Sequence, residues 1–325
     1  MNPSAKTRVP VSGRAPEVLA SSGNGAPGGG AGYPYLLRVA NTRWWHPLAG
    51  STVLVLVWGI PATVLVQILS TVFGADADRM STAADVTAVG LQIALLIPGA
   101  VAAVVLVHRV RPGVLLSASG RPRAGLFVVG LAVATPAFIP MVLAKRAEFA
   151  AEPDPIAGAA GWIGWQAFLP LFAAIVLVLP FQAAAEEIVF RGYLTQAVAT
   201  WTRRVWPAAL ASSLMFVAVH PIHDVWSFAD KLFFGLAMFW LTWRTGGLEA
   251  AIALHVVYNL LLVVAVAADG RVTEMLKDSR TDALGGLTSM GGTAVAVAAL
   301  DWWFRHRAAV VRTDSEGGAR ARAAA

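Results

Sequence analysis

The residues best suited to chemistry in this sequence begin with two adjacent carboxylates, Glu186 and Glu187, at the end of an apolar run. A charge at the centre of a membrane helix costs about 2.5–3.5 kcal/mol on insertion scales, and such residues usually mark function. Neighbours on a helix project about 100° apart, so the two glutamates cannot share one role. Glu187 and Arg191 are four residues apart and can pair on one face, which leaves Glu186 to point elsewhere. The alternative is that both glutamates are merely solvated at a membrane interface.

Two histidines and one asparagine also lie in apolar surroundings. His220 ends the run Phe216-Val-Ala-Val-His220, and His255 is followed one helical turn later by Asn259 on the same face. A single buried histidine is more often a packed core residue than a catalyst. Polar groups on three separate apolar runs are harder to explain by packing, and they favour a functional site. The other three histidines that stand near the ends of apolar runs are interpreted as structural: His46, His108 and His306.

Simple helix geometry predicts that these groups meet. Glu186 and His220 are each seventeen residues from position 203, inside the turn formed by residues 201–204. In an antiparallel hairpin they then lie at one depth, about 25 Å from the turn at about 1.5 Å per residue. His255 and Asn259 lie about 10 and 17 Å into their own helix by the same arithmetic. The depths agree if the turn protrudes by about 10 Å, an assumed distance, which predicts a site in mid-membrane reached by water from one side.

The elements that must position these residues are membrane-spanning helices. The chain is 57% hydrophobic and 14% charged, whereas soluble domains are about half apolar and a quarter charged. Apolar windows predict spans near 48–73, 86–108, 124–144, 164–190, 206–221, 230–243, 248–268 and 284–304. The predicted fold class is therefore an all-α polytopic membrane protein, a bundle of about eight transmembrane helices. The chain has no cysteine, which excludes disulfides and Cys-ligated zinc.

The distribution of charge predicts the orientation of this bundle. Of the 25 Lys and Arg residues, all but seven fall in segments on one side of the membrane. The positive-inside rule makes that side the cytoplasm and places both termini there. The seven predicted outside are Arg79, Lys145, Arg146, Lys231, Arg271, Lys277 and Arg280. Because the basic residues lie between spans, the net charge of +6 does not predict nucleic-acid binding.

These boundaries divide the chain into three parts. Residues 1–46 and 308–325 are predicted to be disordered cytoplasmic tails, since they are rich in small and polar residues. Residues 47–307 form the predicted transmembrane domain. The predicted location is the cell membrane, as a multi-pass integral membrane protein.

Three motifs in this order resemble those of the CAAX prenyl protease and bacteriocin-processing (CPBP, or Abi) family. They are Glu186-Glu187-x-x-x-Arg191, Phe216-x-x-x-His220 and His255-x-x-x-Asn259. The resemblance covers a core of about residues 165–268, and no departure from the motifs is found. It implies an intramembrane endopeptidase of about eight helices that acts on membrane-associated peptides or proteins.

The resemblance also implies a role for each motif residue. Glu186 is the implied general base that deprotonates a water, assisted by His220, while His255 and Asn259 stabilise the oxyanion of the tetrahedral intermediate. Two residues support the base: Glu187 and Arg191. These roles are physically reasonable, because donors aimed at an oxyanion act strongly in a medium of low dielectric constant.

Alternatives remain at this stage. We expect no metal cofactor, but Glu186, His220 and His255 are also a plausible set of zinc ligands with an open position for water. Two other functions are a non-catalytic immunity or scaffold protein of the same fold, and a proton-coupled transporter. The expected partners are the lipid bilayer and a membrane-associated peptide or protein substrate.

Overall fold

The computed structural model describes residues 32–38, 42–76, 81–151, 162–277 and 280–323, with the side chains of 149–151, 274, 276–277 and 308–323 left out. Within these residues the regular structure is helical, apart from one isolated antiparallel bridge between Ser117 and Gly247. The all-α class predicted from the apolar windows is therefore confirmed.

Most of the predicted spans correspond to one helix or to a run of consecutive helices. The first three are α1 (His46–Phe73), α2 (Ala83–Ala94) with α3 (Leu96–Ala102) and the π-helical turn η2 (Ala103–His108), and α4 (Ala124–Ala151). The next are α5 (Trp165–Glu187), the π-helical segment η4 (Ile188–Leu194) and α6 (Thr195–Thr202) in continuous succession, then α7 (Val205–Ala218). The last are α8 (Val225–Thr245), α9 (Glu249–Ala267), the short α10 (Val272–Lys277) and α11 (Ala283–Ala323).

Six helical stretches in the described residues are long and apolar enough to cross a membrane. They are His46–Phe73, Ala83–His108, Ala124–Glu148, Trp165–Thr202, Glu249–Ala267 and Ala283–Arg307. Helices also stand at the other two predicted positions, but α7 has only 14 residues. The 21 residues of α8 include Asp230, Lys231 and Arg244, and that helix is less apolar. The molecule is thus a multi-pass membrane protein, and six helical stretches in its described part have both the length and the apolarity to span.

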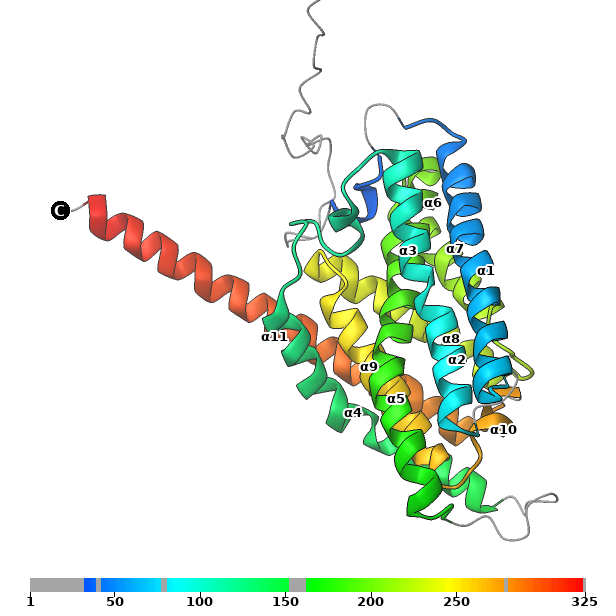
Figure 1. Cartoon of the computed structure of the whole chain (residues 1–325). Helices are drawn as coiled ribbons and strands as arrows, with labels where there is room; N and C mark the ends of the chain where they lie inside the picture. The colour runs from blue at the N-terminus through cyan, green and yellow to red at the C-terminus, as the bar shows by residue number, and fades with distance from the viewer. Residues whose placement is uncertain (1–31, 39–41, 77–80, 152–161, 278–279, 324–325) are drawn as a thin grey trace, which may run out of the picture.

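Helix α9 lies inside the bundle (Figure 1), packed against α4 and α5. Of the 18 residues in its most apolar stretch, 61% are buried, compared with 11% in the corresponding stretch of α1 at the edge. The approach of α4 to α9 is close, because a Cβ at Gly130 would come within 2.6 Å of the Ala253 Cβ. Small residues at such crossings are the usual means by which membrane helices pack. The helix that carries His255 and Asn259 is therefore held in the interior.

The hairpin turn predicted at residues 201–204 is present. Helix α6 ends at Thr202, Arg203 takes a left-handed conformation with φ of 54°, and α7 begins at Val205. The fourth span is longer than predicted, since its helix does not stop near 190 but runs on to Thr202. Helix α7 ends at Ala218, so His220 stands just beyond the helix instead of within a span reaching 221.

The structure differs from the predicted tails at both ends. Tyr33 and Leu37 are fully buried, and the Tyr33 hydroxyl donates a hydrogen bond to the Leu115 carbonyl. This segment lies inside the range 1–46 predicted as a tail, and its apolar side chains, Tyr33, Leu36 and Leu37, belong to the hydrophobic core. Residues 1–31 and 39–41 lie outside the described residues. At the other end, α11 stays helical through Ala323 and extends away from the bundle (Figure 1).

Candidate active site

The two adjacent glutamates end α5 and are buried. Glu186 is 8% exposed and Glu187 is fully buried. The π-helical segment η4 begins directly after them, and such segments inside α-helices occur frequently at functional sites. Arg191, within η4, donates from Nη1 to Glu187 Oε1 at 2.8 Å, with both side chains at 0% exposure. The pairing predicted from their spacing is present, and it neutralises a charge that would otherwise be buried alone.

His255 on α9 joins the two glutamates. Its Nδ1 lies 2.7 Å from Glu187 Oε1, and its Nε2 lies 3.4 Å from Glu186 Oε2. An ionised carboxylate only accepts hydrogen bonds, so His255 donates from Nδ1 and its orientation is fixed by Glu187. Its Nε2 then faces Glu186, and Glu187 serves as the common partner of His255 and Arg191.

Gln182 is a member of this cluster that sequence reasoning missed as a site residue. Its Nε2 donates to Glu186 Oε1 at 2.5 Å, and its Oε1 accepts a hydrogen bond from Asn259 Nδ2 at 2.8 Å. Gln182 therefore connects α5 to α9 and links the side chains of Glu186 and Asn259. Its position four residues before Glu186, on the same helical face, is the signal that could have revealed it.

His220 lies beside the cluster. Its Nδ1 is 2.7 Å from the Phe216 carbonyl oxygen, which only accepts, so Nδ1 carries the proton and Nε2 is free to accept one. The Phe216 ring lies against both histidines, with centroids 4.5 Å from His220 and 6.1 Å from His255. Among the described residues, however, His220 makes no hydrogen bond to the side chains of the cluster.

Aromatic rings enclose these polar groups. The Arg191 guanidinium lies 4.5 Å from the centroid of the Phe216 ring, and Phe234 packs edge-on against His255 at 5.0 Å. In this apolar shell, Glu186 Oε2 and Glu187 Oε2 are buried and make no hydrogen bond within the described part of the chain. A buried carboxylate oxygen without a partner is costly, and it indicates where a water or substrate group binds.

The alternative zinc site can be compared with this geometry. Its predicted ligands are Glu186, His220 and His255. In the described ranges, no group of three His, Asp or Glu side chains is arranged so that it could hold a metal ion. No step below is assigned to a metal.

Comparison with known proteins gives an independent result. Residues 166–261 match the family model described as type II CAAX prenyl endopeptidase Rce1-like. This segment contains all three motifs, so the family resemblance stated from them is confirmed over this region. The chain is also 26% identical over 141 residues to the uncharacterized protein YyaK of Bacillus subtilis (strain 168). That alignment covers 42% of this chain and 46% of YyaK, less than half of each. No solved structure matches the chain.

Proposed function

We propose that this multi-pass membrane protein, whose residues 166–261 are related to the type II CAAX prenyl endopeptidases, is itself an intramembrane endopeptidase. Its proposed substrates are membrane-associated peptides or proteins in the lipid bilayer. We also propose that the chain crosses the membrane eight times, with the short α7 and the less apolar α8 as the two spans beyond the six. Both termini are proposed to lie in the cytoplasm, and the proposed location is the cell membrane.

The observation that carries the proposal is the Glu186 carboxylate, which Gln182 holds at one oxygen and which faces His255 at the other. Gln182 holds Oε1 of this carboxylate at 2.5 Å, while Oε2 is buried without a hydrogen-bond partner among the described residues. A carboxylate held at one oxygen, with no hydrogen bond at the other, is suited to accept a proton from a bound water. The hydroxide so formed attacks the carbonyl carbon of the scissile peptide bond. His220, whose Nε2 can accept a proton, assists Glu186.

Two side chains on α9 stabilise the negative charge that develops on the carbonyl oxygen. Asn259 donates one N–H of its amide to Gln182 and keeps the other for the oxyanion. His255, which Glu187 holds through Nδ1, is the second of these side chains. Donors fixed in advance within an apolar site are commonly the largest contribution to such catalysis. Glu186 then returns its proton to the leaving amine, and the peptide bond breaks.

The test is the replacement Glu186→Gln, which keeps size and polarity but removes the base. Proteolysis is expected to fall by about a hundredfold or more, the usual contribution of a general base. Membrane proteomes of cells with the wild-type and Glu186→Gln proteins would identify substrates, and cleavage would then be measured with purified protein. Glu148→Gln makes the same change at the end of α4, outside this cluster, and should keep full activity. Retained cleavage by folded Glu186→Gln would contradict the assignment and leave the scaffold and transporter alternatives standing.

A further inference from the structure

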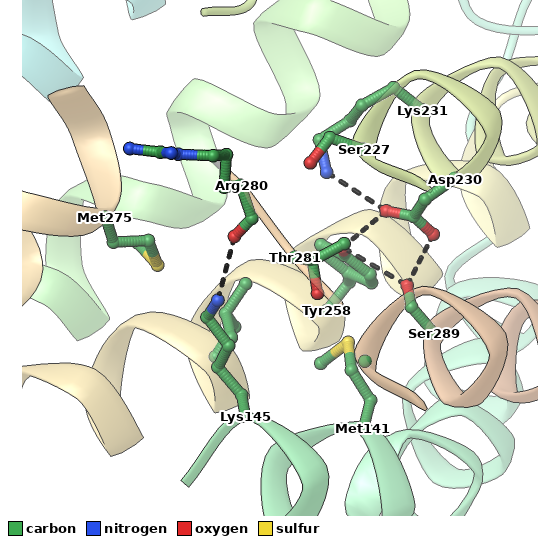
Figure 2. A pocket seen from close by; sticks show the side chains of 12 residues that line it. Met141, Lys145, Ser227, Asp230, Lys231, Tyr258, Met275, Arg280, Thr281 and Ser289 are labelled. Carbon is green, nitrogen blue, oxygen red and sulfur yellow. Dashed lines mark hydrogen bonds and ion pairs between the residues drawn. The ribbon is translucent and has the colours of Figure 1, made fainter. Parts of the chain in front are cut away.

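A second polar cluster surrounds a cavity that is separate from the candidate active site. Its side chains come from α4, α8, α9, α10 and α11 and from residues 280–281 (Figure 2). The cavity volume is about 80 Å³, enough for several water molecules or one small acidic group. It lies near α10, at the end of the bundle opposite α6 (Figure 1).

Phe234 separates the cavity from the candidate active site. Its ring lies 5.0 Å from His255 on one side and 5.1 Å from Tyr258 on the other, between ring centroids. Tyr258 lines the cavity, and Asp230, one turn before Phe234 on α8, forms its floor. The cavity is therefore adjacent to the candidate active site, but it shares none of the proposed catalytic residues.

The floor is a buried aspartate whose oxygens already accept several hydrogen bonds. Ser289 Oγ donates to Asp230 Oδ1 at 2.6 Å, and the Tyr258 hydroxyl donates to Oδ2 at 3.2 Å (Figure 2). Lys231 Nζ is the third donor, 3.1 Å from Oδ2. Because these donors occupy the carboxylate, Asp230 is not available to bind a cation.

Three basic side chains also line the cavity. Lys145, Lys231 and Arg280 line it together with one lining acid, Asp230, and Lys145 also pairs with Glu148 at 2.8 Å. These three are among the seven basic residues predicted on the outer side. An ammonium has three N–H donors, and the contacts of Lys231 with Asp230 and Tyr258 use at most two of them. At least one donor of a largely buried cation remains for a ligand.

We propose that this cavity binds a phosphate or carboxylate group, from an anionic lipid of the surrounding leaflet or as a free anion. Lys231 is its principal donor, and Lys145 and Arg280 line the same cavity. The apolar part of the lining suits the chain to which an acidic lipid group is attached: Met141, Leu262 and Met275. Hydrogen bonds from an ammonium to such a group are charge-assisted and strong in a site of low dielectric constant.

The experiment measures binding without measuring proteolysis, so its outcome is independent of the proposed function. The full chain is reconstituted in nanodiscs of neutral phosphatidylcholine, and its unfolding temperature is followed by the fluorescence of its 12 tryptophans. One arm adds inorganic phosphate, and the other replaces part of the lipid with phosphatidylglycerol. A ligand that binds the folded state raises the unfolding temperature with a saturable concentration dependence. A response to phosphate identifies a free anion, and a response to phosphatidylglycerol alone identifies a lipid.

Three variants separate the cavity from general surface charge. Asp230→Asn combined with Lys231→Gln removes both buried charges together, leaves the net charge unchanged, and should weaken binding by about tenfold. Lys231→Arg keeps the charge and should keep binding. Arg146→Gln removes a cation at the same end of α4 that does not line the cavity, and should bind as the wild type does. If the double variant does not fold, Lys145→Gln is used instead, because Lys145 lines the cavity from α4, across from Lys231 on α8. It should also weaken binding.

Two outcomes would overturn the proposal. One is the absence of a saturable response of the wild type in both arms. The other is an equal loss of binding in Arg146→Gln and in the cavity variants, which would show that only the overall surface charge attracts the anion.

Discussion

Gln182 holds the side chains of both Glu186 and Asn259 through one carboxamide. Replacing it can therefore separate this positioning role from the role proposed for Glu186 as the base. Gln182→Met keeps the length of the side chain and removes both hydrogen bonds, to Glu186 and to Asn259. We expect kcat to fall by about tenfold or more for loss of these hydrogen bonds, with a smaller change in KM. Kinetics of the purified variant with an identified substrate would test this. Gln67→Met on exposed α1 is the matched control, and an equal loss there would refute the positioning role.

The proposed chemistry at Glu186 uses no metal, and this can be tested directly. His255 is oriented by Glu187 at Nδ1, which suits a hydrogen-bond donor paired with Asn259 one turn away. We expect purified protein to keep its proteolytic activity in strong chelator, and elemental analysis to find no stoichiometric zinc. Activity lost in chelator and restored by added zinc would overturn this mechanism, because zinc could polarise the carbonyl itself. The protease assignment would survive that result.

At the scale of single elements, Asp224 determines where α8 begins. Its Oδ1 accepts the backbone N–H groups of Trp226 and Ser227 at 2.7 and 2.8 Å, and its Oδ2 accepts that of Thr281 at 3.3 Å. This N-cap starts the helix at Val225, five residues before the span predicted from 230. Asp230 and Lys231 consequently lie inside α8, where they face the cavity.

Removing this cap should destabilise α8 without affecting the chemistry. Asp224→Ala is expected to lower the free energy of unfolding by about 0.5–2 kcal/mol, whereas Asp224→Asn should keep most of it. Thermal unfolding and amide hydrogen exchange over residues 225–229 would measure the difference. No change in either variant would show that α8 is held by packing alone.

The same carboxylate predicts a dependence of stability on pH. Burial raises the pKa of Asp224, but hydrogen bonds from Ser227, Thr281 and Trp226 outweigh it and hold the pKa below its ordinary value. A group whose pKa is lower in the folded state stabilises that state above its unfolded pKa of about 3.9. The contribution is lost as pH falls through the folded pKa, and it should be absent in Asp224→Asn.

For the whole molecule, the orientation in the membrane is the prediction with the widest consequences. Both termini are expected in the cytoplasm, because eighteen of the 25 basic residues then lie inside and seven outside. Reporter fusions at residue 20 and residue 315 should therefore give the same cytoplasmic signal. Opposite signals would mean that one helix does not span, and α7 and α8 are the two to re-examine, since neither is among the six of spanning length and apolarity.

The sequence alone determined the helical class, the turn at residues 201–204 and the pairing of Glu187 with Arg191. Each of these depends on residues close together in the chain, where apolar length and the i, i+4 spacing act directly. It also identified the motif residues, because their types and order are visible without a structure.

Only the tertiary structure decided which of these residues touch. It placed Gln182 between Glu186 and Asn259, set His255 between two glutamates, and left His220 beyond the end of α7. These contacts join α5 and α9, and they depend on how the helices rotate and cross. Side-chain packing over the whole bundle sets that rotation, and no local spacing encodes it. The same reason applies to the cavity around Asp230 and Lys231, which needs side chains from α4, α8, α9, α10 and α11 to meet.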